Sequence, residues 1–471
     1  MNNFRTERDT MGEMRVPADA LYGASTARAV ENFPIAHEPI PAAMVHAFGY
    51  LKAACAQANL DLGKLDRHRA DAIIAACNEV AEGQYDAHFP VDIYQTGSGT
   101  STNMNANEVV ANLANQKLGL GVGAKGQEGA VHPNDHVNMG QSSNDTFPTA
   151  MHIAAAKSLS QELIPALSRL ADSLEAKAKA WDDLVKIGRT HLMDATPIRV
   201  GQVFSGYASQ ARYAATRAGR ALQRTLENLP IGGTAVGTGI NTHPQFAGLV
   251  CEAISAQLGI NFEEATNHVE AQAAKDSFVA AHGELKTIAV SLSKIANDIR
   301  HLGSGPRCGL GELNLPAIQP GSSIMPGKVN PVICESAIQV ACRVIGNDAT
   351  VTTAALGGVG SLFELNVAMP VMIDAFLESV KLEANVASVF VDKLLDGLGV
   401  DEARCQELID QSLMMVTSLA PKIGYEESAA LAKEAYRTGK TIRQLCLDEN
   451  VLPAAELDKL LDPDAMTRPS A

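Results

Sequence analysis

The chain has 471 residues, of which 46% are hydrophobic and only 4% aromatic, and its formal net charge is −15. A surface this acidic repels nucleic acid and anionic lipid, so we expect neither nucleic acid nor a membrane as a partner. The length exceeds what one hydrophobic core organises and predicts about three domains.

The cysteines and the first residues both favour a cytoplasmic protein. Eight cysteines are present without a C-x-x-C pair or any other paired spacing, which predicts reduced thiols. The opening MNNFRTERDT has no apolar run and contains two acidic residues, unlike a secretion signal. No run of about 18 uncharged apolar residues is present, so no membrane span is expected.

Residues 1–141 predict a mixed, mostly helical N-terminal domain, with helices near 40–60 and 66–83. Its first polar segment is TGSGTSTNMNANE, residues 96–108. Gly97 and Gly99 allow close backbone approach, and the hydroxyl and amide groups around them are neutral donors. The segment is either part of a binding site or a hydroxyl-rich turn that caps a helix beginning near Asn105.

The second polar segment is VHPNDHVNMGQSSND, residues 131–145. His132 and His136 stand four residues apart, but no further zinc ligands follow at a suitable spacing, so a metal site is not favoured. Ser142, Ser143 and Asn144 precede a helix predicted from about 149. They form either an N-cap cluster or a cradle for a carboxylate.

Residues 142–360 predict a central domain of long Ala-rich helices, with segments at 149–187, 201–228, 264–302 and 331–357. The segment 264–302 carries a seam of apolar residues at alternating steps of three and four: Leu285, Ile288, Leu292, Ile295, Ile299 and Leu302. One helix of that length spans about 55 Å. Such helices predict an elongated bundle that packs against copies of itself, rather than a monomeric helical repeat, because no self-similar period is present.

Residues 361–471 predict a C-terminal helical region, with a long segment at 361–396 and a small tail domain after it. We expect the final MTRPSA to be loosely held.

Two further polar segments interrupt the helices of the central domain. GRTHLMDATP, residues 188–197, places His191 beside Thr190 and Arg189 in a polar break. A lone histidine is usually structural, but one in this setting is a candidate general acid or base.

The last polar segment is GSSIMPGKVNP, residues 321–331. It is not a Walker A loop, because five residues separate its glycines and Val329 follows Lys328. Instead Lys328, Asn330 and the start of the next helix are placed to converge on one negative group. The alternative is a surface loop with an incidental lysine.

Together the four polar segments offer many hydroxyl and amide donors, one lysine and one histidine, without a nucleotide or metal motif. This inventory suits a small dicarboxylate and acid–base chemistry that uses no cofactor.

The same four segments resemble the signature segments of the fumarase/aspartase superfamily, and within it the class II fumarases. The similarity continues through DTMGEMRVPADALYGAST, IGGTAVGTG, FELNV and SLMMVTSLAPKIGY. The resemblance implies a mainly α, three-domain fold whose central bundle forms a homotetramer core, with each active site built from three subunits. It implies reversible hydration of fumarate to (S)-malate in the tricarboxylic acid cycle, by anti addition or elimination of water through an aci-carboxylate intermediate.

The resemblance also implies roles for single residues. Ser322 is the base, and Lys328 and Asn330 bind the carboxylate that becomes the intermediate. His191 acts through a water held with Thr100 and Asn144, and Glu335 pairs with His191. The residues expected to hold the substrate are Ser98, Gly99, Thr100, Ser142, Ser143, Asn144, Thr190 and Ser323.

His132, Asn134 and Asp135 match a second, peripheral dicarboxylate site of the family. The match departs from the family at Gly129, where a basic residue is expected, and at His136, where an acidic one is common. Three other functions stay open: an aspartate ammonia-lyase, a hydratase acting on mesaconate, and a non-catalytic structural relative. TGSGT and Gly327 resemble the fumarase pattern more than the aspartase pattern.

Overall fold

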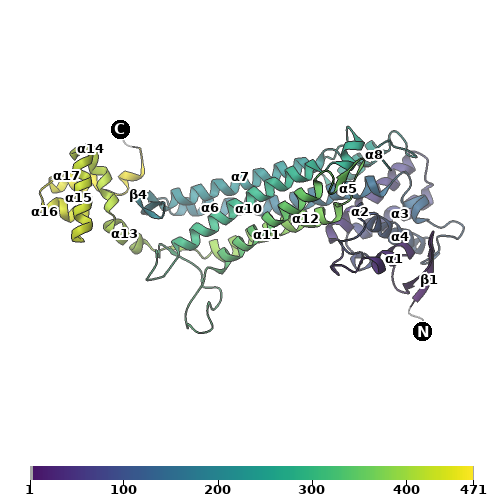
Figure 1. The fold of residues 1–471 in the computed structure, drawn as a ribbon, viewed down its shortest axis with the longest axis horizontal. Helices are drawn as coiled ribbons and strands as arrows, with labels where there is room; N and C mark the ends of the chain where they lie inside the picture. Colours follow the sequence, from purple (N-terminus) through teal and green to yellow (C-terminus); the bar gives the residue numbers. More distant parts are fainter. Residues whose placement is uncertain (1–3, 470–471) are drawn as a thin grey trace. The chain divides into compact units, whose positions relative to one another are not determined.

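The computed structural model describes residues 4–469, which are mainly helical as expected (Figure 1). The chain packs into two compact units, each built from several segments. The first unit comprises residues up to Pro165, Thr216–Ala289 and Cys342–Ala384, and the second comprises Ala166–Ala215, Val290–Ala341 and the residues from Asn385 on.

The first unit is organised around α2 (Ala42–Asp61). This helix is apolar on nearly every side and packs against α3 (Arg67–Ala81), α5 (Ser143–Ser158) and α8 (Phe246–Leu258). The helices predicted near 40–60 and 66–83 are therefore confirmed. A two-stranded antiparallel hairpin, β1 (Phe4–Asp9) and β2 (Gly12–Pro17), precedes α1 (Ala24–Asn32) and was not predicted.

Two helices begin earlier than the sequence indicated. α4 runs over Thr100–Lys117 rather than from near Asn105, and α5 begins at Ser143 rather than near 149. Their first turns are rich in Ser, Thr and Asn, which favour caps over helix interiors and therefore suggested loop. The predicted segment 149–187 contains α5, a π-helical turn over Leu159–Leu163 and α6 (Ile164–Ala180).

The prediction of one continuous helix over 264–302 is wrong. The segment contains α9 (His268–Ala273) and α10 (Asp276–Leu302), which is 27 residues and about 40 Å long. The buried ammonium of Lys275 ends α9 by donating to the carbonyls of Ala271, Gln272 and Ala274 at 2.8–2.9 Å. No Gly or Pro marks this break in the sequence.

The apolar seam of α10 is confirmed. Leu285, Ile288, Ile295 and Ile299 are at most 1% exposed, and Leu292 is 6% exposed. The other long helices are α7 (Val200–Leu226), α11 (Val332–Ala355) and α12 (Met369–Phe390), near their predicted positions. A short hairpin, β6 (Ser361–Leu362) and β7 (Leu365–Asn366), precedes α12 within the segment predicted as helix from 361.

Within the second unit, the polar segment after α6 is an antiparallel hairpin and not a simple break between helices. β3 (Val185–Thr190) pairs with β4 (Met193–Arg199). A second short pair joins β5 (Leu313–Asn314) to β8 (Gly399–Val400).

The end of the second unit is a cluster of short helices near the C-terminus (Figure 1). These are α13 (Glu402–Gln411), α14 (Ala420–Ile423), α15 (Tyr425–Thr438), α16 (Ile442–Asp448) and α17 (Ala454–Leu460). They enclose their own apolar core, to which Leu419, Leu445 and Leu457 contribute. Across the described residues, no helix is both long and apolar enough to cross a lipid bilayer.

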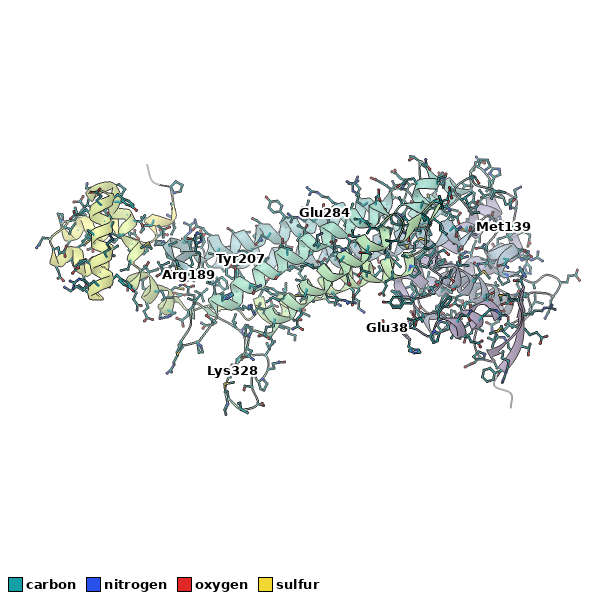
Figure 2. The ribbon with its side chains drawn as sticks, in the orientation of Figure 1. Glu38, Met139, Arg189, Tyr207, Glu284 and Lys328 are labelled. Atoms are coloured by element: carbon teal, nitrogen blue, oxygen red, sulfur yellow. The ribbon has the colours of Figure 1, made fainter. Side chains whose placement is uncertain are left out.

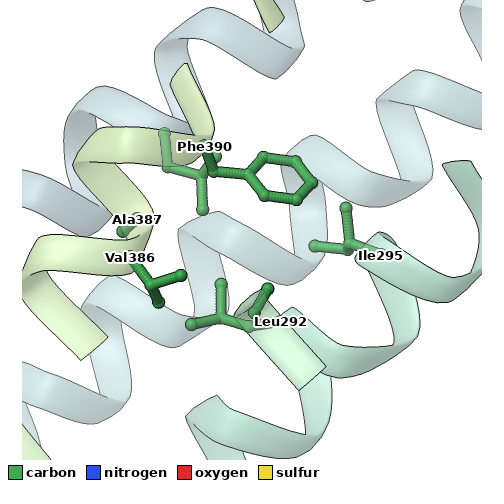
Figure 3. A pocket seen from close by; sticks show the side chains of 7 residues that line it. Leu292, Ile295, Val386, Ala387 and Phe390 are labelled. Carbon is green, nitrogen blue, oxygen red and sulfur yellow. The ribbon is translucent and has the colours of Figure 1, made fainter. Parts of the chain in front are cut away.

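A small apolar cavity of about 10 Å³ lies among the helices of the second unit (Figure 3). Its lining contains no polar side chain: Leu170, Leu292, Ile295, Ala337, Val386, Ala387 and Phe390. A space this small and apolar shows that the side chains around it pack closely.

We expect Leu292→Ala to enlarge this cavity and to lower the free energy of unfolding by about 3 kcal/mol. Thermal unfolding followed by circular dichroism measures the effect. Val389→Ala is the matched control, because Val389 is 38% exposed on α12 and its truncation opens no cavity. Equal losses for the two variants would contradict the packing described for the bundle.

Candidate active site

The first group of predicted residues meets where the N-termini of α4 and α5 approach each other. The Ser98 and Thr100 hydroxyls are 2.9 Å apart, and the Thr100 and Ser143 hydroxyls are 2.7 Å apart. Asn144 is fixed beside them, because its Nδ2 donates to the carbonyl of Ala235 at 2.8 Å. The positive ends of two helices together with these hydroxyls favour a bound anion.

The two glycines of TGSGT allow close approach, but the groups that approach them belong to the protein and not to a ligand. A Cβ at Gly97 would lie 1.6 Å from the carbonyl oxygen of Val367. Gly99 has a φ of +74°, and a Cβ there would lie 2.0 Å from the ring of Phe147 on α5. The glycines therefore let the start of α4 lie directly against α5 and the chain before α12.

Asp145 is a buried residue that the sequence did not single out. Ser142 and Asp145 form a capping box at the start of α5. The other carboxylate oxygen of Asp145 accepts backbone N–H groups of Gly232 and Thr234 at 3.1 and 2.9 Å. Burial raises the pKa of Asp145 to about 6 although these hydrogen bonds favour the ionised form. The carboxylate thereby holds the IGGTAVGTG segment against the N-terminus of α5.

The second unit places His191 at the tip of the β3–β4 hairpin. His191 and Leu192 form its two-residue turn with φ angles of +58° and +63°, a conformation that usually selects Asn and Gly. His191 is exposed and Leu192 is 87% exposed. The base of the hairpin is anchored by Glu312, which is 1% exposed and pairs with Arg189 at 2.8 Å and Lys186 at 3.2 Å. Arg189 is therefore a structural anchor.

The GSSIMPGKVNP loop is held together by hydrogen bonds between its own residues. Its ends are joined by hydrogen bonds of 2.8 Å from Gly321 N to the Lys328 carbonyl and from Asn330 Nδ2 to the Gly321 carbonyl. The Ser322 hydroxyl accepts the backbone N–H groups of Ile324 and Met325 at 3.3 and 3.2 Å. Two amide dipoles thus point at the oxygen of the predicted base.

Lys328 lies on the part of this loop that projects away from the helices (Figure 2). Among residues 4–469 its ammonium has no hydrogen-bond or ion-pair partner, and Ser323 beside the predicted base is also exposed. Glu335 lies in the first turn of α11. Within one chain, no hydrogen bond in the described part joins Glu335 to His191, so their pairing stays a prediction.

The site residues thus fall into two groups. Ser98, Gly99, Thr100, Ser142, Ser143 and Asn144 lie together in the first unit. Thr190, His191, Ser322, Ser323, Lys328, Asn330 and Glu335 lie in the second unit, on the hairpin tip, the loop and the start of α11.

Comparison with known proteins identifies the family. Residues 12–346 match a lyase family, and residues 415–468 match the C-terminal domain of fumarase C. The chain is 55% identical to a fumarate hydratase class II of Corynebacterium glutamicum, over 98% of this chain and 96% of the relative. It is 53% identical to the fumarate hydratase class II of Mycobacterium tuberculosis, over 99% and 96%.

The chain belongs to the class II fumarase family.

Solved structures agree with this assignment. A class II fumarase from Schistosoma mansoni superposes with a TM-score of 0.94 at 38% identity, covering 99% of this chain and all of the relative. A fumarate lyase:delta crystallin from Brucella melitensis, bound to cobalt, superposes with the same TM-score at 42% identity and the same coverage. The resemblance to the class II fumarases and the mainly α fold that it implied are confirmed.

The residues that match the peripheral site of the class II fumarase family form one π-helical turn, Pro133–Val137. The Nδ1 of His132 accepts the N–H groups of Asn134 and Asp135 at 3.3 Å, and the Nδ1 of His136 accepts the N–H of His132 at 2.8 Å. Both rings thus stabilise the turn. Binding of a dicarboxylate there stays a prediction.

We expect Gly99→Ala to abolish activity and to destabilise the first unit, because the added methyl group overlaps Phe147 and the residue must keep a positive φ. Gly119→Ala is the matched control: its φ is +77°, but nothing lies within 4 Å of the added Cβ. The control substitution should lower the free energy of unfolding only by the backbone strain, about 1–2 kcal/mol, and the variant should keep its activity. Thermal midpoints and turnover of both variants test this, and an active Gly99→Ala protein would refute the close contact.

Proposed function

We propose that the chain is a fumarate hydratase that interconverts fumarate and (S)-malate. The observation that carries this proposal is the identity of 50–55% over nearly the full chain to relatives named fumarate hydratase class II. The dicarboxylate substrate agrees with the two groups of site residues, which offer donors for two carboxylates.

The difficult step is removal of a proton from the carbon next to a carboxylate, because it leaves a second negative charge on that carboxylate. Preorganised donors aimed at the developing charge supply the largest stabilisation in such reactions. We propose that Ser322 takes the proton from malate. The two backbone N–H groups that point at its hydroxyl oxygen support this role, because they stabilise the serine alkoxide and lower the cost of deprotonation.

Lys328 and Asn330 are proposed to bind the carboxylate that becomes the aci-carboxylate. Lys328 is free for this task, and its ammonium adds a full charge next to the N-terminus of α11. Asn330 holds the two ends of the loop together through Gly321, so the loop geometry and the carboxylate site depend on the same amide.

Water addition and loss are assigned to the other residues. His191 is proposed to exchange a proton with a water held by Thr100 and Asn144, and Glu335 to pair with His191. The hydroxyl pair of Thr100 and Ser143 supports a site for the second carboxylate, to which Ser98, Gly99, Ser142, Thr190 and Ser323 would also contribute. Placing the base and the water on different elements permits anti addition.

We propose that the active protein is a homotetramer with sites assembled from three subunits. The long helices support this because they expose apolar residues and unobstructed glycines to the outside. Tyr213 and Val290 are 62% and 55% exposed, on α7 and α10. A Cβ at Gly206 of α7 or Gly346 of α11 would meet nothing within 4 Å, so another helix can approach closely there.

A cytoplasmic location completes the proposal. All eight cysteines are free thiols, and six of them are buried, as expected for a protein kept in a reducing compartment. We propose that no cofactor takes part, since the proton transfers use side chains alone.

Turnover assays test the substrate. We expect ultraviolet absorbance of fumarate to appear when the protein is given (S)-malate and not when it is given aspartate. Release of fumarate from aspartate alone would identify an ammonia-lyase instead, and a higher kcat/KM for mesaconate than for fumarate would identify a methylated substrate.

Lys328→Ala should reduce kcat/KM by about a thousand-fold, because one charged donor to the intermediate is lost. Its thermal midpoint should stay near that of the unsubstituted protein, because the lysine is exposed and has no partner among residues 4–469. Lys64→Ala, at another exposed lysine, is the control for loss of a surface charge and should keep full activity. A fall in stability that parallels the loss of activity would count against the role of Lys328.

Mixing two inactive variants tests the shared site. If His191 and Ser322 of one site come from different subunits, unfolding and refolding His191→Asn together with Ser322→Ala restores about a quarter of the sites. Each variant refolded alone should stay inactive. If the mixture also stays inactive while forming tetramers, His191 and Ser322 of one site come from the same subunit.

A further inference from the structure

Lys52 is a fully buried lysine that no motif identified. It lies in α2, is 0% exposed, and its ammonium donates to three neutral oxygens. These are Asn103 Oδ1 at 2.8 Å, Asn138 Oδ1 at 3.0 Å and Gln141 Oε1 at 2.9 Å. No carboxylate of the described residues forms an ion pair with it, so its charge is not neutralised by contact.

One of these contacts leads directly to the first turns of α4 and α5. Asn103 Oδ1 also accepts the hydroxyl of Thr146 at 3.1 Å, which links the first turns of α4 and α5. This link and the Thr100–Ser143 pair are three residues apart in both helices. Three residues rise about 4.5 Å along a helix, so the ammonium lies about one helical turn behind the proposed carboxylate site.

The buried carboxylate of Asp145 is the negative charge that the Lys52 ammonium opposes. This carboxylate fixes the IGGTAVGTG segment but also places a negative charge behind a site for anions. Asp145 and Lys52 do not hydrogen-bond, yet each acts on the other through space. If Lys52 were neutral, the anion would face Asp145 without an opposing charge.

We propose that Lys52 is a positioning residue for the reaction, whose buried cation offsets Asp145 and favours the dicarboxylate held at the N-termini of α4 and α5. The inference rests on the proposed function for the identity of that dicarboxylate. Burial strengthens the effect, because charges shielded from water and salt interact over longer distances.

The decisive variant is Asn103→Asp, which places a carboxylate against the ammonium and neutralises it at nearly unchanged shape. We expect the thermal midpoint to be largely kept, kcat/KM for malate to fall about ten-fold or more, and the inhibition constant of succinate to rise by a similar factor. Asn78→Asp is the control: it adds the same charge on α3 of the same unit, where the Asn78 oxygen accepts Gln257 Nε2. It should change neither constant.

A pH profile separates the charge of Lys52 from a purely structural role. Burial lowers the pKa of Lys52 to about 8, so kcat/KM should decline above that pH as the cation is lost. The titratable groups that face Lys52 are Cys55 on α2, Cys77 on α3 and Asp145 on α5. Burial raises the pKa of both thiols, to about 12 for Cys77, so neither titrates in this range. In Asn103→Asp the added carboxylate raises the pKa of Lys52, and the alkaline decline should move to higher pH.

Gln141→Glu repeats the test from a second contact of the ammonium. The proposal is overturned if either folded variant keeps unsubstituted values of kcat/KM and succinate inhibition. It is also overturned if neither variant folds, because a carboxylate beside a native lysine cation should be tolerated. The unsubstituted protein is assayed first with malate, so a wrong substrate assignment appears there and not in the comparison of variants.

Discussion

The contact between the first turns of α4 and α5 is the constraint on which the first part of the candidate site depends. Two helix N-termini usually stay apart, because their unpaired N–H groups are both positively polarised and need hydrogen-bond acceptors. Here hydroxyls and a side-chain amide bridge the two ends, and Gly99 lets Phe147 fill the space between them. The bridge holds two positive helix ends side by side, an arrangement that an anion stabilises further.

The placement of single charges would let an acidic protein hold the proposed dianionic substrate. With a net charge of −15, the protein as a whole repels the proposed substrate. The attraction therefore has to be local. The structure holds one positive group away from water and another exposed on a loop. Lys52 lies buried behind one group of donors, and Lys328 lies free on the loop that carries the other.

Much of this arrangement could be predicted from the sequence, and the features that the prediction missed have physical causes. The seam of α10 was readable because burial of a helix face leaves a regular apolar period. The end of α9 could not be predicted, because a buried lysine caps it through tertiary packing that local sequence does not encode. The β3–β4 hairpin was missed because its turn is His-Leu instead of Asn-Gly.

The candidate residues were easier to predict than their surroundings. Ser322, Lys328 and His191 lie in polar segments that interrupt apolar helices, so they stand out in the sequence. Lys52 and Asp145 lie inside helices, where a charged residue at an unknown depth looks like any surface residue. Only the burial of α2 and the approach of α5 to the IGGTAVGTG segment give these two charges their significance.

Exposure of the second group of residues links assembly to chemistry in the proposed mechanism. A lysine in water contributes little to holding an anion, because solvent screens its charge. The amides around Ser322 likewise stabilise an alkoxide strongly only when water is excluded from the loop. Lys328 and His191 are both exposed within one chain, so their proposed roles require a surface that covers them. The unobstructed glycines and exposed apolar residues of the long helices favour a further copy of the chain as that cover. In the proposed assembly, a subunit that dissociates would lose the low-polarity setting together with the residues that its neighbours contribute.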